Sequence, residues 1–380
     1  MISVSVGSPH PGLIDHWDDL IARAPGNVFM HPVALKAAAD LGFADVRVLT
    51  AWDEGAAPRR LVGLWALQVV RRLPLPPILS AAPYYYAFVC VPVIDPSVAA
   101  EVATAFLTAI RTDPTLPNAV ALAEADVGSL GYHALAEAAC RGGHPLVTVR
   151  TSARPVASRQ VGVKASGATR KKLRQDWNRL SAQGQVELVS HETPEAVAAA
   201  LEVFLAMERA SWKGACGTAI LCSDRDTAFV RRLVVDLAAV GAASVVLLTL
   251  DGRTIAAQVL LHCGGTVYTW KMAFDAAFAK FSPGVLLVDK ITGNRLEEEG
   301  IAELNSCSGE DGFMGRVWSG RQPLADVLLD TGQRRSVAFV LELARWRAYA
   351  QLREWRNALR ARGWLQPNGP RHAGPKAVRA

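Results

Sequence analysis

Three apolar segments joined by two tight turns occupy residues 244–275 and constrain the fold more than any other part of the sequence. The segments are SVVLLTL, TIAAQVLLHC and TVYTWKMAFD, and they are separated by Asp251-Gly252 and Gly264-Gly265. Asp-Gly and Gly-Gly favour two-residue hairpin turns, because both central residues of such a turn need a positive φ angle. The pattern therefore predicts an antiparallel meander of three strands.

Helical patterns lie on both sides of this meander. One begins at Thr193-Pro194 and a second ends at Gly241, and both have apolar residues at the spacing of an amphipathic helix. A third follows Ser282-Pro283-Gly284 and ends at Gly300, and the segments IAELNSC (301–307) and PLADVLL (323–329) predict two further strands. The predicted order is two helices, three strands, a helix and two strands.

The first half of the chain repeats this order. Its predicted elements are helices around Trp17 and Leu35, strands at 46–52, 61–70 and 84–93, a helix from Ser97 and a strand at 118–125. A chain of 380 residues is long enough for two domains. We therefore predict an α+β protein with two copies of one plan, each an antiparallel-rich central sheet flanked by helices.

Composition changes mark the predicted domain limits. We expect an N-terminal domain at 1–150, a Ser-, Pro- and Gly-rich linker at 151–169 and a C-terminal domain at 170–332. A long basic helix is predicted at 333–365 and a disordered tail at 366–380.

Charge is concentrated at the C-terminal end of the chain. Residues 331–380 hold eleven Lys and Arg against two Glu, a net charge of +9, so the rest of the chain carries −3 of the total of +6. The main body is therefore not expected to bind nucleic acid. No apolar run approaches the ~18 residues of a membrane span and no signal-peptide pattern is present, so a cytoplasmic location is expected. The six cysteines form no Cys-x-x-Cys pair or Cys/His cluster, which predicts neither disulfides nor a metal site.

The Ser-Pro-Gly sequence has the features of a helix start that accepts an anion. Ser282 is a suitable cap, Pro283 fits the first helical position, and Gly284 leaves the first turn without a side chain. The free N–H groups of a helix N-terminus suit a phosphate or pyrophosphate. The alternative is a well-capped helix with no ligand.

On these residues the chain resembles a known family. The segments ERASWKG (208–214) and LLTLDGRT through LEEEGI (247–301) resemble the GNAT domain of the cellulose-biosynthesis-associated acetyltransferases (CelD/BcsL type) over about 190–320. The first half resembles it weakly through FMHPVALKAA and RLVGLWAL, and the chain is more distantly similar to Fem-type aminoacyl-tRNA-dependent transferases. The chain departs from the family because AFAKFSPG replaces the glycine-rich pyrophosphate loop and NSCSGEDGFMGRVW lacks an expected Asp and an aromatic-Lys pair.

The resemblance implies tandem GNAT domains with an extra C-terminal helix, and an acyltransferase activity. An acetyl or other acyl group would pass from acyl-CoA to an amine or hydroxyl of a small molecule, such as a sugar or polysaccharide precursor, with no metal. The implied catalytic residues are Glu208 as first choice of base, then Asp275 and Asp311. The implied cofactor-binding residues are Tyr268 on the strand at 266–275 and Lys280, Phe281, Ser282 and Gly284 in the following loop.

Each of these assignments has a structural alternative. Glu208 could form an ion pair with Lys or Arg, Asp275 could cap a turn, and Tyr268 could be an ordinary sheet aromatic. The basic residues of 170–180 could hold a phosphorylated acceptor, coenzyme A or RNA, or could form a solvated helix face. At the level of function, the alternatives are a Fem-like transferase that uses aminoacyl-tRNA and a non-catalytic scaffold of an envelope polysaccharide system.

The C-terminal helix carries Trp346, Trp355 and Trp364 at intervals of nine residues. Nine residues turn a helix by 900°, so successive tryptophans are predicted on alternating faces. We expect the first turns to pack on the domain and the basic end to bind an acidic partner or an anionic membrane surface, which would make the protein peripheral at the inner membrane.

Overall fold

The computed structural model describes residues 1–163, 167–332 and 334–361. The end of the predicted C-terminal helix, with Trp364, and the predicted tail at 366–380 lie outside the described residues. The chain divides into two compact units. The first unit comprises Met1–Leu35, Ala44–Ser152 and the chain from Pro323 onward, and the second comprises Lys36–Phe43 and Ala153–Gln322. The units therefore differ from the continuous ranges predicted, because Lys36–Phe43 belongs to the second unit and the segment that carries β13 and α11 belongs to the first.

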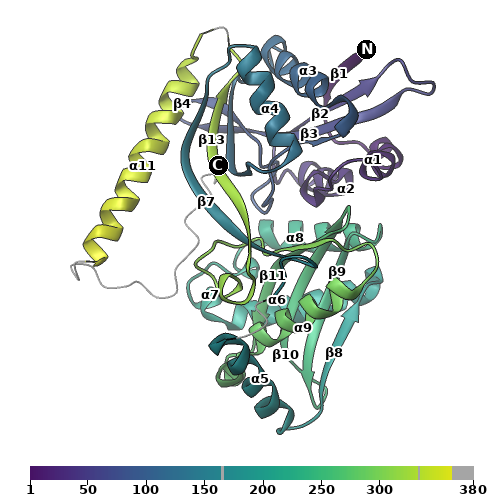
Figure 1. The fold of residues 1–380 in the computed structure, drawn as a ribbon, viewed down its shortest axis with the longest axis vertical. Coiled ribbons are helices and arrows are strands. Elements are labelled where there is room, and N and C mark those ends of the chain that lie inside the picture. Colours follow the sequence, from purple (N-terminus) through teal and green to yellow (C-terminus); the bar gives the residue numbers. More distant parts are fainter. Residues whose placement is uncertain (164–166, 333, 362–380) are drawn as a thin grey trace. The chain divides into compact units, whose positions relative to one another are not determined.

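The first unit is built on a mixed sheet whose strands follow the order β1-β2-β3-β4-β6-β13 (Figure 1). Strands β4 and β6 are parallel, whereas β1–β2, β2–β3, β3–β4 and β6–β13 are antiparallel pairs. The elements are β1 (Ile2–Gly7), α1 (Ile14–Ile21), α2 (Pro32–Asp40), β2 (Val46–Asp53), β3 (Arg60–Arg72), β4 (Leu75–Ser80), β5 (Val93–Ile94), α3 (Ala99–Thr112), β6 (Ala119–Asp126), α4 (Leu130–Arg141), β7 (Leu146–Ser158), β13 (Gly320–Asp330) and α11 (Val337–Ala361).

The second unit repeats this arrangement with the strand order β7-β12-β11-β10-β9-β8. Strands β11 and β12 are parallel, and helices α6 and α9 cover the two faces of the sheet (Figure 1). The elements are α5 (Ala168–Ser181), β8 (Val186–His191), α6 (Pro194–Ala210), α7 (Trp212–Ala215), α8 (Asp224–Ala238), β9 (Ala243–Leu250), β10 (Arg253–Cys263), β11 (Thr266–Phe274), α9 (Pro283–Glu297), β12 (Glu303–Asn305) and α10 (Met314–Val317).

The predicted meander is confirmed as β9, β10 and β11. Asp251, Gly252, Gly264 and Gly265 all have positive φ angles, between 49° and 79°, as two-residue hairpin turns require. Thr193 caps α6 by accepting a hydrogen bond from the Ala196 N–H. Turn and cap chemistry therefore determined these boundaries.

Two sequence predictions in the backbone are wrong. The segment 84–93 is not a strand, because its carbonyl groups bond to side chains: Asn27 Nδ2 donates to Val91 O (3.0 Å) and Trp65 Nε1 donates to Cys90 O (3.2 Å). The missing strand is β4, which the two prolines of LPPILS conceal. The predicted linker also continues as strand through residue 158 in β7, where Pro155 O accepts a hydrogen bond from the Ser306 N–H.

His31 precedes α2 and makes stability depend on pH. It is buried, its Nδ1 accepts a hydrogen bond from the Val33 N–H (3.2 Å), and burial lowers its pKa from 6.5 to about 4. Between pH 6.5 and 4 the unfolded chain binds a proton that the folded chain does not. This residue should therefore reduce the free energy of unfolding, as pH falls through that window, by about 1.4 kcal/mol per pH unit.

The variant His31→Asn is expected to remove this part of the pH dependence. Asparagine can cap the helix in the same way but does not titrate. Urea unfolding of both proteins at pH 7, 6 and 5 measures the difference. If the free energy of unfolding changes with pH by the same amount in the two proteins, His31 does not titrate as its burial requires.

Candidate active site

Strands β11 and β12 separate at one point of the sheet in the second unit. They pair only at Thr266↔Glu303, Val267↔Leu304 and Tyr268↔Asn305, whereas β11 continues to Phe274. The part of β11 after Tyr268 therefore has no neighbouring strand on that side among the described residues. Where two strands part in this way, an extended ligand can lie along the continuing strand as an added strand.

A β-bulge lies at the same point. The pairing with β10 passes from Val259↔Lys271 to Leu261↔Tyr268, so three residue steps on β11 stand against two on β10. Gln258 Nε2 donates to the carbonyls of Lys271 (2.9 Å) and Val259 (3.0 Å), which supports the distorted backbone. A bulge leaves one residue outside the regular ladder, and bulges are frequent next to active sites.

Buried polar side chains are concentrated in this part of the second unit. Each of the following is at most 4% exposed: Arg154, Glu208, Gln258, Thr269, Asn305 and Ser306. Burial of polar groups is costly unless they are hydrogen-bonded, so a fold seldom accumulates them without a function. Thr269 Oγ1 donates to Asn305 O (3.2 Å) where the strands part, and Asn305 Nδ2 donates to Gln322 Oε1 (3.0 Å).

Lys271 points from β11 toward α6. Its neighbour Met272 faces Gly284 on α9, and side chains alternate along a strand, so Lys271 faces the opposite side, with Glu208 and Lys213. Burial, and then the positive charge of Lys213, lower the pKa of Lys271 from 10.5 to about 8, whereas Glu208 acts in the opposite direction. The sequence analysis missed Lys271. Its signal was a lysine inside the otherwise apolar strand TVYTWKMAFD.

Glu208 is close to these lysines but is fully engaged. Its side chain is buried, Lys213 Nζ donates to Oε1 (2.7 Å), and the Ile220 N–H donates to Oε2 (2.9 Å). The ion pair with lysine considered as an alternative is thus present, although it is buried. This geometry suits a carboxylate that holds Lys213 and the loop at Ile220 in place.

The two other candidate carboxylates lie in loops. Asp275 accepts hydrogen bonds from the Ala277 N–H (2.9 Å) and from Arg253 Nη2 (2.6 Å), so it caps the turn after β11. Asp311 is exposed in the loop between β12 and α10. Its neighbour Glu310 accepts a hydrogen bond from Arg321 Nε (3.1 Å).

Of the predicted binding residues, Tyr268 lies on β11, whereas Lys280 and Phe281 lie in the turn that follows it. Tyr268 is buried at the last β11–β12 pair, and burial is the main cause that raises its pKa well above 10. Phe281 is in the core, and Lys280 Nζ lies 4.9 Å from the centre of its ring. Both belong to the turn of a 3₁₀ helix at Ala276–Phe281, which stands where a glycine-rich loop would be.

The predicted hydroxyl cap by Ser282 is wrong. Ser282 has a left-handed backbone (φ 53°, ψ 48°), because the chain reverses from the 3₁₀ helix into α9 at this residue. Its main-chain carbonyl, not its hydroxyl, accepts from the N–H groups of Val285 (2.9 Å) and Leu286 (3.1 Å). Gly284 does allow a close approach to the first turn of α9, but the group that approaches is the side chain of Met272 and not a ligand. A Cβ at Gly284 would lie 2.6 Å from Met272 Sδ.

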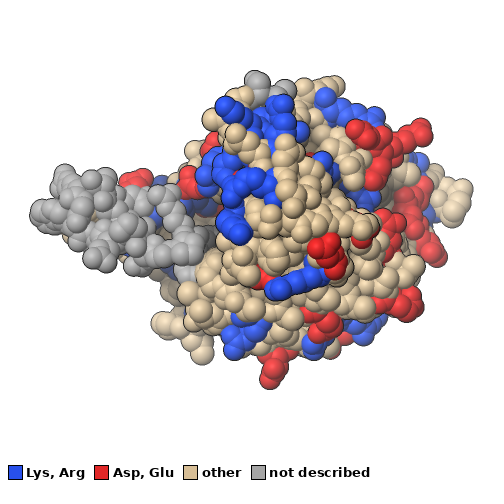
Figure 2. Space-filling view, turned by 90° about the horizontal axis from the view of Figure 1, so that it is seen from below, with Lys and Arg blue, Asp and Glu red and all other residues tan. Residues whose placement is uncertain are grey.

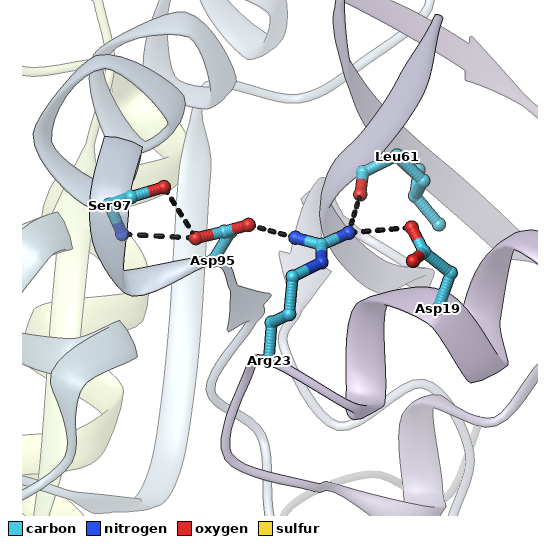
Figure 3. A network of polar contacts seen from close by, with 5 residues as sticks. All are labelled: Asp19, Arg23, Leu61, Asp95 and Ser97. Atoms are coloured by element: carbon cyan, nitrogen blue, oxygen red, sulfur yellow. Dashed lines mark hydrogen bonds and ion pairs between the residues drawn. The ribbon is translucent and has the colours of Figure 1, made fainter. Parts of the chain in front are cut away.

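The matching helix start in the first unit is closed by the protein's own carboxylate (Figure 3). Asp95 is buried and accepts hydrogen bonds from the Ser97 N–H (3.0 Å) and hydroxyl (2.6 Å). Arg23 bonds to Asp95, to Asp19 (2.7 Å) and to Leu61 O (3.3 Å), so it joins α1 to this helix start. An anion already occupies the position that a phosphate would need.

The surface of α5 is strongly basic. Figure 2, which views the molecule of Figure 1 from below, shows Lys and Arg side chains gathered on one part of that face. The exposed basic residues of α5 are Lys171, Lys172, Arg174 and Arg179. Lys172 and Arg179 pair with the buried Asp176, at 2.6 and 3.5 Å.

Other kinds of site are not evident in the described residues. No group of three His, Cys, Asp or Glu side chains in 1–163, 167–332 and 334–361 could hold a metal ion. A groove of about 850 Å³ in the first unit is lined by residues that include Val4, Glu101 and Thr108, none of which belongs to the splayed strands.

Comparison with known proteins agrees with this description. Residues 167–313 match a family described as an acetyltransferase (GNAT) domain. No curated protein matches the chain in sequence. Similar solved structures include FemX (TM-score 0.58, 11% identity, 86% of this chain and 96% of that chain) and L-PGS from Bacillus licheniformis (0.53, 15%, 90% and 97%). Another is the C-terminal domain of a putative lysylphosphatidylglycerol synthetase from Agrobacterium fabrum (0.50, 13%, 84% and 91%).

These similarities confirm the predicted fold class. The chain has a mixed α+β, tandem GNAT-like fold, because the likeness spans most of the chain, and the helix α11 follows β13. The segment that matches the family contains the splayed strands, the bulge and Lys271. At such low identities the solved structures establish the fold alone.

Proposed function

We propose that the second unit transfers an acyl group from an activated carrier to an amine or hydroxyl at the splay between β11 and β12. The observation that carries the proposal is the parting of β11 from β12 after Tyr268, with Lys271 on the continuing strand, inside the segment that matches a GNAT domain. An acyl donor with an amide-containing arm can bind at such a point as an added strand.

The residues at this point suit acyl transfer. A main-chain N–H of β11 at the splay would polarise the acyl carbonyl and stabilise the oxyanion that forms. The attacking amine or hydroxyl must lose a proton, and the neutral form of a lysine with a pKa of about 8 can accept it near physiological pH. We assign this role to Lys271. The acyl–carrier bond then breaks, and the leaving thiolate or alkoxide takes up a proton to become the free thiol or hydroxyl.

The first candidate donor is acyl-CoA, with a small molecule or a sugar precursor as acceptor. It follows from the match of residues 167–313 to an acetyltransferase domain. The residues at the start of α9, Lys280 to Gly284, would then lie near the pyrophosphate. Lys280 is exposed and could pair with it.

The second candidate donor is aminoacyl-tRNA, as in the Fem-type transferases. Two observations favour it. The 3₁₀ turn at 276–281 replaces an open glycine-rich loop, and its amides bond internally, as the Ala277 N–H does to Asp275 and the Ser282 N–H does to Ala279 O (3.0 Å). The exposed basic residues of α5 also suit a polynucleotide backbone.

A thermal-shift comparison tests the proposal and separates the donors. Acetyl-CoA, coenzyme A, aminoacyl-tRNA and uncharged tRNA would each be added in excess. A ligand at a hundred times its Kd stabilises the folded protein by about 2.7 kcal/mol. We expect stabilisation by acetyl-CoA or by aminoacyl-tRNA, followed by transfer to an amine. Stabilisation by none of them would favour the non-catalytic scaffold.

Gly284→Val is expected to weaken binding of acetyl-CoA by more than tenfold, about 1.4 kcal/mol. The added side chain collides with Met272, at 2.6 Å from Sδ and 2.9 Å from Cε, and displaces β11 at the splay. Isothermal titration measures the change, and Gly284→Ala is the smaller variant if valine prevents folding.

Gly293→Val is the matched control on the same helix. A Cβ at Gly293 meets nothing within 4 Å, so binding should be unchanged. Equal affinities of the Gly284→Val and Gly293→Val variants would remove the start of α9 from the donor site.

A further inference from the structure

Helix α11 has two different faces, of which the inner one belongs to the first unit. Phe339 and Leu343 are buried in a cluster with Val70, Ile78 and Leu328, and Trp346 packs against it. The buried Glu342 pairs with Arg72 (3.4 Å) and with Arg345. The expectation that the first turns pack on the domain is therefore confirmed.

The outer face carries an apolar stripe that the tryptophan spacing did not reveal. Its positions are separated by four, three, four, four and three residues, and at 100° per residue they all point away from Phe339. The stripe consists of Val337, Leu341, Ala344, Ala348, Leu352 and Trp355. Val337 and Trp355 are each 71% exposed and Leu352 is 59% exposed. Trp346 and Trp355 lie on opposite faces, as predicted.

Arginines border the outer stripe on both sides. Arg356 lies along one border and Arg347 along the other, at the positions that the helical period gives them, whereas Arg345 is held by the buried Glu342. Residues 334–361 contain seven arginines and two glutamates, and one of these glutamates is the buried Glu342. The exposed side of the helix is thus apolar along its centre and positive at its edges.

This charge pattern selects among the possible occupants of the stripe. A second copy of the helix would place arginine borders against arginine borders, which repel. An anionic bilayer instead offers negative charge at the headgroups and an apolar layer just below them. None of the described helices is long and apolar enough to cross a membrane, so the helix would lie in the interface.

We propose that α11 binds the surface of anionic membranes through its outer stripe. The helix lies parallel to the surface, Leu341, Leu352 and Trp355 enter the acyl boundary, and the bordering arginines contact phosphate groups. The inner face stays packed on the first unit, so no part of the fold opens. The proposal does not depend on the proposed acyl transfer.

Sedimentation of the full chain with vesicles tests this proposal. We expect binding to vesicles of phosphatidylglycerol and phosphatidylcholine, little binding to pure phosphatidylcholine, and strong weakening by added salt. The double variant Leu352→Ser/Trp355→Ser should bind the mixed vesicles at least tenfold more weakly. Both side chains are exposed, so its thermal midpoint should match the wild type.

Two further variants complete the design. Val240→Ser, which changes another exposed apolar residue (43%) outside the helix, should bind like the wild type. The double variant Arg347→Gln/Arg356→Gln should bind the mixed vesicles more weakly than the wild type at low salt. Its binding should also fall less than that of the wild type when salt is added. Unchanged binding of the stripe variant overturns the proposal, and so does a wild-type dimer in light scattering that the stripe variant abolishes, which would identify a second copy as the occupant.

Discussion

Lys271→Met is expected to lower the turnover number roughly 10²–10⁴-fold, with a much smaller effect on donor affinity. Methionine keeps the unbranched shape of the side chain but can neither accept a proton nor carry a charge. The proton of the attacking group would then have no acceptor at the splay of β11 and β12. Steady-state kinetics with the donor found by thermal shift measures the two parameters separately.

The pH dependence of the wild-type rate tests the same assignment. The pKa of Lys271 is lowered to about 8 by burial, so a lysine that acts as a base makes the rate rise with pH and level off above about 8. Lys271→Arg is the control, because arginine remains protonated and should be as impaired as methionine. An active arginine variant, or a rate that falls above pH 8, would show that the charged form is the one required.

The part of the fold that could be predicted from the sequence is the part set by local chemistry. Hairpin turns at Asp251-Gly252 and Gly264-Gly265 and the cap at Thr193 depend on residues a few positions apart. The strand β4 and the irregular path of 84–93, where a strand was predicted, could not be predicted, because side chains from distant segments, such as Asn27 and Trp65, satisfy the backbone of 84–93.

The candidate site shows the same division. Glu208, Tyr268 and Gly284 were identified from the sequence, and all three lie on the elements around the splay. Which groups these residues contact could not be predicted. Glu208 was the first choice of base, with an ion pair as the alternative, and its carboxylate is shared between Lys213 and the Ile220 N–H, twelve residues away. Ser282 was predicted to cap with its hydroxyl, but the reversal from a 3₁₀ turn brings its carbonyl into that position. Such roles depend on how the turn and the sheet pack together.

Glu208→Gln is expected to destabilise the second unit by about 3 kcal/mol. The amide keeps the size of the side chain but leaves Lys213 and Lys271 without their countercharge in a buried setting. It also presents at most one oxygen where two contacts, with Lys213 Nζ and the Ile220 N–H, are made now. Urea unfolding at pH 7 measures the loss.

Glu202→Gln is the matched control on the same helix. Glu202 forms an ion pair with Arg231 (2.6 Å) in which both side chains are about half exposed, so its loss should cost less than about 1 kcal/mol. The kinetics of Glu208→Gln distinguish its two possible roles. Without the carboxylate, the pKa of Lys271 should fall further, so the rise of the rate moves to lower pH. If the rate of Glu208→Gln no longer rises with pH while the rate of Lys271→Met still does, Glu208 is the base and Lys271 is not.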